Sequence, residues 1–88
     1  MNIEQLYYSA DDPRYSDLLP AINYQNLNAV LDVLKDGAAY SKEQVAAMAG
    51  GSIPFLTANL AGALLRELRD DGKVTEVKIN GGCYYKVG

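Results

Sequence analysis

The strongest constraint on the fold is a stripe of leucines in the second half of the chain. Most of them recur at steps of three and four residues, which places them on one face of an amphipathic helix. The stripe consists of Leu56, Leu60, Leu64, Leu65 and Leu68. Pro54 has its φ preset for a first helical turn, and Gly72 is a typical residue beyond a helix C-terminus, so the pattern predicts a helix over 54–71. A chain of 88 residues is long enough for one domain and too short for two, so every element must share a single small core.

Two shorter helices are predicted before it. The first, over 24–36, ends at Gly37 and has an apolar face with helical spacing, formed by Leu27, Val30, Leu31 and Leu34. The second begins at Ser41, which forms the sequence pattern of a capping box with Gln44, and it ends at Gly50 and Gly51. Its apolar face is expected to hold Val45, Ala46, Met48 and Ala49.

A β-hairpin is predicted after the third helix, with strands over 73–79 and 83–87. A three-residue loop of Asn80, Gly81 and Gly82 would gather the apolar residues on one face, whereas a two-residue Asn-Gly loop would mix the faces. We therefore expect the longer loop, which pairs Ile79 with Cys83, Val77 with Tyr85 and Thr75 with Val87. The polar face would then carry Glu76, Lys78, Tyr84 and Lys86.

The first 23 residues are predicted to form an acidic, tyrosine-rich N-terminal arm before a domain over 24–88. Turn-forming residues are dense between Ser9 and Pro20, which argues against regular structure there. Tyrosine offers apolar area with a polar tip, so the tyrosines of this region could pack on their own domain or on a partner. The candidates for a partner interface are Tyr7, Tyr8, Tyr15 and Tyr24.

Composition narrows the chemistry. The chain is 49% hydrophobic and 22% charged, the balance of a folded globular protein. It has no histidine and one cysteine, Cys83, so the usual zinc sites and the commonest general base are missing, and we expect no cofactor and no enzymatic activity. The Gly50-Gly51-Ser52 turn also lacks the lysine and spacing of a P-loop. The start of the chain lacks the pattern of a secretory signal, and the stretch over 55–65 is too short to span a bilayer, so a cytoplasmic protein without membrane contact is expected.

The predicted order is helix, helix, helix, hairpin, and three stretches resemble a winged helix-turn-helix domain of small bacterial and phage regulators. They are YSKEQVAAMAG at 40–50, LLRELRDDGKV at 64–74 and KVTEVKINGGCYYKVG at 73–88. In such proteins the pattern formed here by Leu65, Leu68, Gly72 and Val74 packs the recognition helix on the core and leads into the wing. The resemblance implies an α+β winged helix over 26–88, a three-helix helix-turn-helix core followed by a β-hairpin wing.

The same resemblance implies a DNA-binding transcriptional regulator, with helix 54–71 reading double-stranded DNA and hairpin 73–87 as the wing. Asn59 could pair with adenine and Arg66 with guanine or phosphate. The complete set of DNA-binding candidates is Ser52, Thr57, Asn59, Arg66, Lys78 and Lys86. Simpler roles stand beside these: Ser52 as a cap or turn residue, Asn59 as a solvated side chain, and Arg66 as an ion-pair partner of Asp70.

Charge distribution leaves a second function open. Residues 1–40 have a formal charge of −4 and residues 41–88 of +1, so any contact with a polyanion belongs to the second half and should be weak for a monomer. A homodimer would double the contacts. The alternative is a winged-helix protein–protein interaction module that does not bind DNA, an adaptor or a phage-type inhibitor of a host nucleic-acid-handling protein. Its contact surface would be a wedge of small residues, Thr57, Ala58, Gly62 and Ala63.

Overall fold

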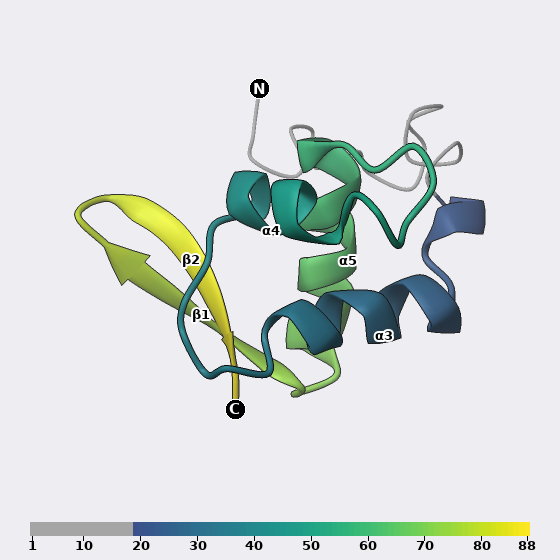
Figure 1. Ribbon diagram of the computed structural model, residues 1–88. Helices are drawn as coiled ribbons and strands as arrows, with labels where there is room; N and C mark the ends of the chain where they lie inside the picture. The colour runs from purple at the N-terminus through teal and green to yellow at the C-terminus, as the bar shows by residue number, and fades with distance from the viewer. Residues whose placement is uncertain (1–18) are drawn as a thin grey trace, which may run out of the picture.

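The computed structural model describes residues 19–88, and it has an α+β fold in which an antiparallel hairpin follows three α-helices (Figure 1). A short 3-10 helix, η1 (Leu19–Ala21), comes first. The helices are α3 (Tyr24–Val33), α4 (Lys42–Ala49) and α5 (Ala58–Asp70), and the strands are β1 (Val74–Ile79) and β2 (Gly82–Val87). The predicted order of elements is therefore confirmed.

Helix α5 lies at the centre, and α3 and α4 pack against it (Figure 1). Four of the five leucines of the predicted stripe are buried, and the exception is the half-buried Leu56, which precedes the helix. The partners of the stripe come from every other element of this part of the chain. They include Val30, Leu34, Val45, Ala49, Ile53, Val74 and Tyr85, all buried.

The predicted start of the long helix at residue 54 is wrong. Helix α5 begins at Ala58, after Thr57, whose extended backbone and side chain form the N-cap: its hydroxyl accepts a hydrogen bond from the backbone N–H of Leu60 at 3.2 Å. Phe55 has a φ of +58°, in the left-handed region, and a residue in that conformation cannot continue a right-handed helix. Pro54 consequently lies in the turn between α4 and α5.

Helix α4 begins with the predicted capping box. The Ser41 hydroxyl accepts from the Gln44 N–H at 3.1 Å, and the Gln44 side chain accepts from the Ser41 N–H at 2.8 Å. Its buried face is narrower than expected, because Val45 and Ala49 are buried whereas Met48 is 43% exposed.

The hairpin register differs from the predicted one. Asn80 and Gly81 both have positive φ, 49° and 82°, and form a two-residue loop that pairs Ile79 with Gly82 and Lys78 with Cys83. This conformation matches the twist of the flanking strands, and Asn-Gly is the sequence that adopts it most readily. The faces are therefore mixed: Glu76 and Lys78 lie on one face, with Val74, Cys83, Tyr85 and Val87, and the other face holds Thr75, Val77, Ile79, Tyr84 and Lys86.

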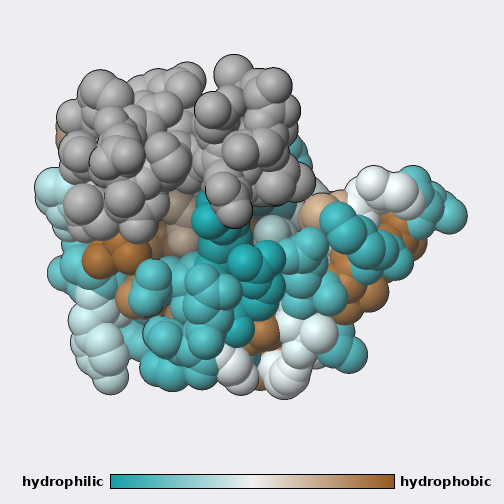
Figure 2. All heavy atoms as spheres, turned by 180° about the vertical axis from the view of Figure 1, so that it is seen from behind, coloured by the Kyte–Doolittle hydropathy of each residue, from teal (hydrophilic) through white to brown (hydrophobic). Residues whose placement is uncertain are grey.

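The gathering of apolar side chains on one face does not fix the hairpin register, because most of the hairpin lies away from the core. It projects from the body of the domain with hydrophilic and hydrophobic residues both at its surface (Figure 2). Within the two strands only Val74 and Tyr85 are buried, and they share one face at the base of the hairpin. The turn geometry therefore decides the pairing, and the predicted polar face is split between the two sides.

Tyr40 adds a pairing that the sequence patterns did not predict. Its N–H donates to the Tyr85 carbonyl at 2.9 Å, and the Tyr85 N–H donates to the Tyr40 carbonyl at 2.8 Å, so the segment before α4 pairs with the free edge of β2. The Tyr40 hydroxyl also donates to Asp36 at 2.5 Å. This bond raises the pKa of Tyr40 and lowers the pKa of Asp36.

The end of the predicted N-terminal arm packs with the domain. Ala21 and Ile22 contact the core, and the buried side chain of Asn26 donates to the Ala21 carbonyl at 2.8 Å. The predictions for Tyr7, Tyr8 and Tyr15 lie outside the described residues. Within residues 19–88 no helix has the length and apolar character that crossing a membrane requires.

Candidate nucleic-acid interface

Basic residues from α4, α5 and the hairpin follow one another along one side of the domain. A Cβ added at Gly62 would lie 3.2 Å from Cδ of Lys42, so the aliphatic stem of Lys42 lies across α5 at this glycine. Arg66 is one helical turn beyond Gly62, and Arg69 is its neighbour three residues on. From there the series continues onto the hairpin through Lys78. We refer to Lys42, Arg66, Arg69 and Lys78 as the basic row.

Glu76 connects the last two members of the basic row. Its carboxylate accepts from Arg69 at 2.5 Å and lies 3.4 Å from the ammonium of Lys78. The Glu76 side chain is only 22% exposed, and the Arg69 guanidinium holds its pKa below the usual range. The same pairing raises the pKa of Arg69, whose guanidinium also contacts Asp70 at 3.3 Å. Both ion pairs therefore persist at neutral pH and offset part of the positive charge of the row.

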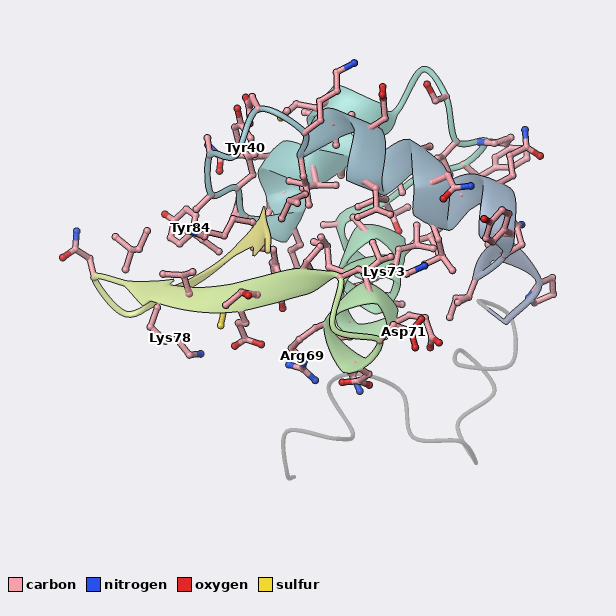
Figure 3. All side chains as sticks on the ribbon, turned by 90° about the horizontal axis from the view of Figure 1, so that it is seen from below. Tyr40, Arg69, Asp71, Lys73, Lys78 and Tyr84 are labelled. Carbon is pink, nitrogen blue, oxygen red and sulfur yellow. The ribbon has the colours of Figure 1, made fainter. Side chains whose placement is uncertain are left out.

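Cys83 fixes the direction of Lys78. The Lys78 ammonium donates to the Cys83 sulfur at 2.6 Å across the hairpin, and this bond raises the pKa of Lys78. The Cys83 sulfur in turn donates to Glu76 at 3.4 Å. Lys78 therefore lies on the same side of the hairpin as Arg69, with Tyr84 on the opposite side (Figure 3).

The structure brings only some of the candidate DNA-binding residues together. Asn59 and Arg66 are two helical turns apart on α5 and therefore share one face of the helix. This face is directed outward, because Asn59 is exposed and Arg66 is half-buried. Thr57 is exposed just before them, with its hydroxyl oxygen occupied as the N-cap. Ser52 lies in the turn that ends α4, where its N–H donates to the Ala49 carbonyl. It is thus not at the start of α5, because that helix begins four residues later than predicted.

Lys86 is separated from Lys78. Since Lys86 pairs with Thr75 and Lys78 with Cys83, the two lysines lie on opposite faces of the hairpin. Beyond Arg66 the outward face of α5 becomes acidic, with Glu67 and Asp70 exposed. The surface able to read a groove is therefore confined to the part of α5 from Asn59 to Arg66.

The predicted wedge of small residues is wrong in one member. Gly62 is buried, because the stem of Lys42 covers it, so Thr57, Ala58, Gly62 and Ala63 do not form one open surface. Tyr24, the described member of the proposed partner interface, is 75% exposed at the start of α3.

Sequence reasoning missed two members of the basic row, Lys42 and Arg69. For Lys42 one signal was available. A glycine inside a helix costs up to about 1 kcal/mol relative to alanine, so Gly62 indicates a position where another segment approaches the helix closely. For Arg69 no such signal exists, because its contact with Glu76 depends on the hairpin register.

In the described part of the chain no group of three or more His, Cys, Asp or Glu side chains could hold a metal ion.

Comparisons of the chain with family models, with curated proteins and with solved structures find no match.

Proposed function

We propose that this chain is a winged-helix domain that binds double-stranded DNA, with α5 in the major groove and the hairpin as the wing. The observation that carries the proposal is the basic row, since it draws cations from three elements to the side of α5 that also exposes Asn59. Helix-turn-helix proteins read bases from the start of the second helix while neighbouring elements hold the phosphates. The pairing of Tyr40 with β2 supports the winged-helix assignment, because it ties the base of the hairpin to the helices.

Each residue has a role that follows from its position. Asn59 and Arg66 face outward on α5 and would contact base edges, where asparagine suits adenine and arginine suits guanine. Lys42 lies across α5 at Gly62 and Lys78 lies on the hairpin, and both would contact phosphates. Because Glu76 and Asp70 offset part of the charge, we expect few phosphate contacts and a log–log salt slope between about −2 and −4.

The test is fluorescence anisotropy of labelled random duplex DNA, titrated with the protein at about 50 mM and about 200 mM salt. Lys42→Gln and Arg66→Gln should each weaken binding several-fold at low salt. Lys86→Gln is the matched control, because it removes the same charge from the opposite face of the hairpin. Equal losses in all three variants would contradict the assigned face, and absence of binding at low salt would contradict the function.

A protein-interaction module is the second candidate function. It is favoured by the formal net charge of −3 and by Phe55, which is 96% exposed. A full-size aromatic ring in water is a common feature of protein interfaces. A stable complex with a protein partner, formed by a chain that does not bind duplex DNA at low salt, would favour this function over DNA binding.

A further inference from the structure

One end of the domain is built from segments without charged side chains. Residues 19–31 and 44–65 contain no Asp, Glu, Lys or Arg. They form η1, most of α3 and α4, the turn between α4 and α5, and the first half of α5. The hairpin projects from the other end of the domain (Figure 1). Depletion of charge together with exposed aromatic residues is the composition of the centre of a protein interface.

Phe55 is the most prominent residue of this uncharged end. Its side chain is 96% exposed, and its backbone has the left-handed φ of +58° that a bulky residue rarely adopts. No packing within the described domain accounts for the ring, because almost all of its surface faces water. A group outside residues 19–88 would have to cover the ring for its apolar area to contribute free energy.

A hollow lies directly beside Phe55. It has a volume of about 350 Å³ and is lined by residues of η1, of the start of α3 and of the turn before α5: Pro20, Ala21, Asn23, Gln25, Asn26, Pro54 and Phe55. A cavity of about 150 Å³ holds a benzene molecule. The hollow is therefore large enough to receive a phenylalanine ring.

We propose that two copies of this chain associate through η1, the start of α3 and the turn between α4 and α5, with Phe55 of each copy inserted into the hollow of the other. The ring and the hollow are adjacent on one surface, so a two-fold axis between the copies fills both hollows at once. A two-fold interface also places identical residues near one another. Charged surfaces would then repel, and the copies carry a formal charge of −3 each, whereas the described segments of this end contribute no charged side chain to such repulsion.

Charge also decides against nucleic acid as the occupant. Phosphates require cations, and none comes from the segments that line this hollow. The hairpin lies at the far end and stays accessible in such a dimer (Figure 1). Association of the chain with itself is measured without DNA, so its outcome is independent of the proposed function.

The experiment is sedimentation equilibrium of the full chain over a range of concentrations, compared with Phe55→Gly. Glycine adopts a φ of +58° without strain, so this variant removes the ring and keeps the turn, and a thermal melt by circular dichroism checks that it folds. Loss of two buried aromatic rings should raise the dimer dissociation constant at least about a hundredfold. Ile79→Ser is the matched control, because Ile79 is a 43% exposed apolar residue on the hairpin, and it should leave the dissociation constant unchanged.

Two results would overturn the proposal. One is a wild-type chain that remains monomeric up to about 1 mM, which would leave the uncharged end to a different protein partner. The other is a dimer whose dissociation constant is the same in Phe55→Gly as in the wild type, which would place the interface elsewhere. A dimer weakened by Phe55→Gly and not by Ile79→Ser supports the exchange of rings.

Discussion

Replacing Glu76 by glutamine should tighten DNA binding while it weakens the domain slightly. The carboxylate of Glu76 lies 2.5 Å from Arg69 and 3.4 Å from Lys78, and glutamine keeps its shape and one acceptor oxygen without the charge. Loss of a partly exposed charge-assisted pair should cost about 1 kcal/mol of unfolding free energy. A domain of this size has roughly 5 kcal/mol of stability, so it remains folded.

The expected gain in affinity follows from counterion release. If the released positive charge neutralises one further phosphate, the log–log salt slope steepens by about 0.9. Affinity then rises about fifteenfold at 50 mM salt and about fourfold at 200 mM salt. Anisotropy titrations at both salt concentrations measure the two factors, and urea denaturation measures the cost in stability.

The control for this experiment is Asp32→Asn. Asp32, near the end of α3, pairs with Lys35 at 3.2 Å, so the variant frees a lysine and changes the net charge by the same amount away from the basic row. It should leave DNA affinity nearly unchanged. An equal gain in both variants would show that net charge alone is responsible, and an unchanged affinity in Glu76→Gln would refute the role of the basic row.

Three further predictions concern stability and titration. Leu64→Ala removes a fully buried side chain of α5 and should cost about 3 kcal/mol of unfolding free energy, measured by urea denaturation. Thr57→Ala should cost about 1 kcal/mol through loss of the N-cap, whereas Ser52→Ala should cost less than about 0.5 kcal/mol, and equal losses would contradict the observed helix start. The hydrogen bond to Asp36 raises the pKa of Tyr40, so this bond stabilises the fold below the ordinary tyrosine pKa and is lost as pH rises through the raised pKa. Asp36→Asn should therefore lower the pKa of Tyr40, measured by ultraviolet titration. An unchanged pKa would argue against the bond in solution.

Periodicity predicted the elements well because the core decides them. The leucines of α5 and the capping box of Ser41 depend on residues close together in sequence, and both are confirmed. The start of α5 was misplaced because two signals compete: proline suits a first helical turn, but threonine three residues later supplies a cap. The left-handed backbone of Phe55 that separates them has no sequence signature, since it is a property of neither phenylalanine nor proline.

The candidate interface was harder to predict than the fold. Asn59 and Arg66 follow from helical spacing alone. Lys42 reaches α5 only because two helices pack closely at Gly62, and Lys78 faces Arg69 only in the register that the Asn-Gly turn selects. A one-residue change of register moves every hairpin side chain to the other face, so the position of each charge depends on the turn.

The pairing between Tyr40 and Tyr85 has a consequence for the order in which the domain assembles. All of α4, α5 and β1 lies between these two tyrosines in the chain, whereas the helices and the hairpin join residues that are near in sequence. Closing so long a loop costs chain entropy before the two hydrogen bonds can form. Local elements should therefore form first, and this pairing should form late in folding. Changes that weaken the pairing should therefore accelerate unfolding more than they slow folding, and the hairpin should be the first part of the domain to detach.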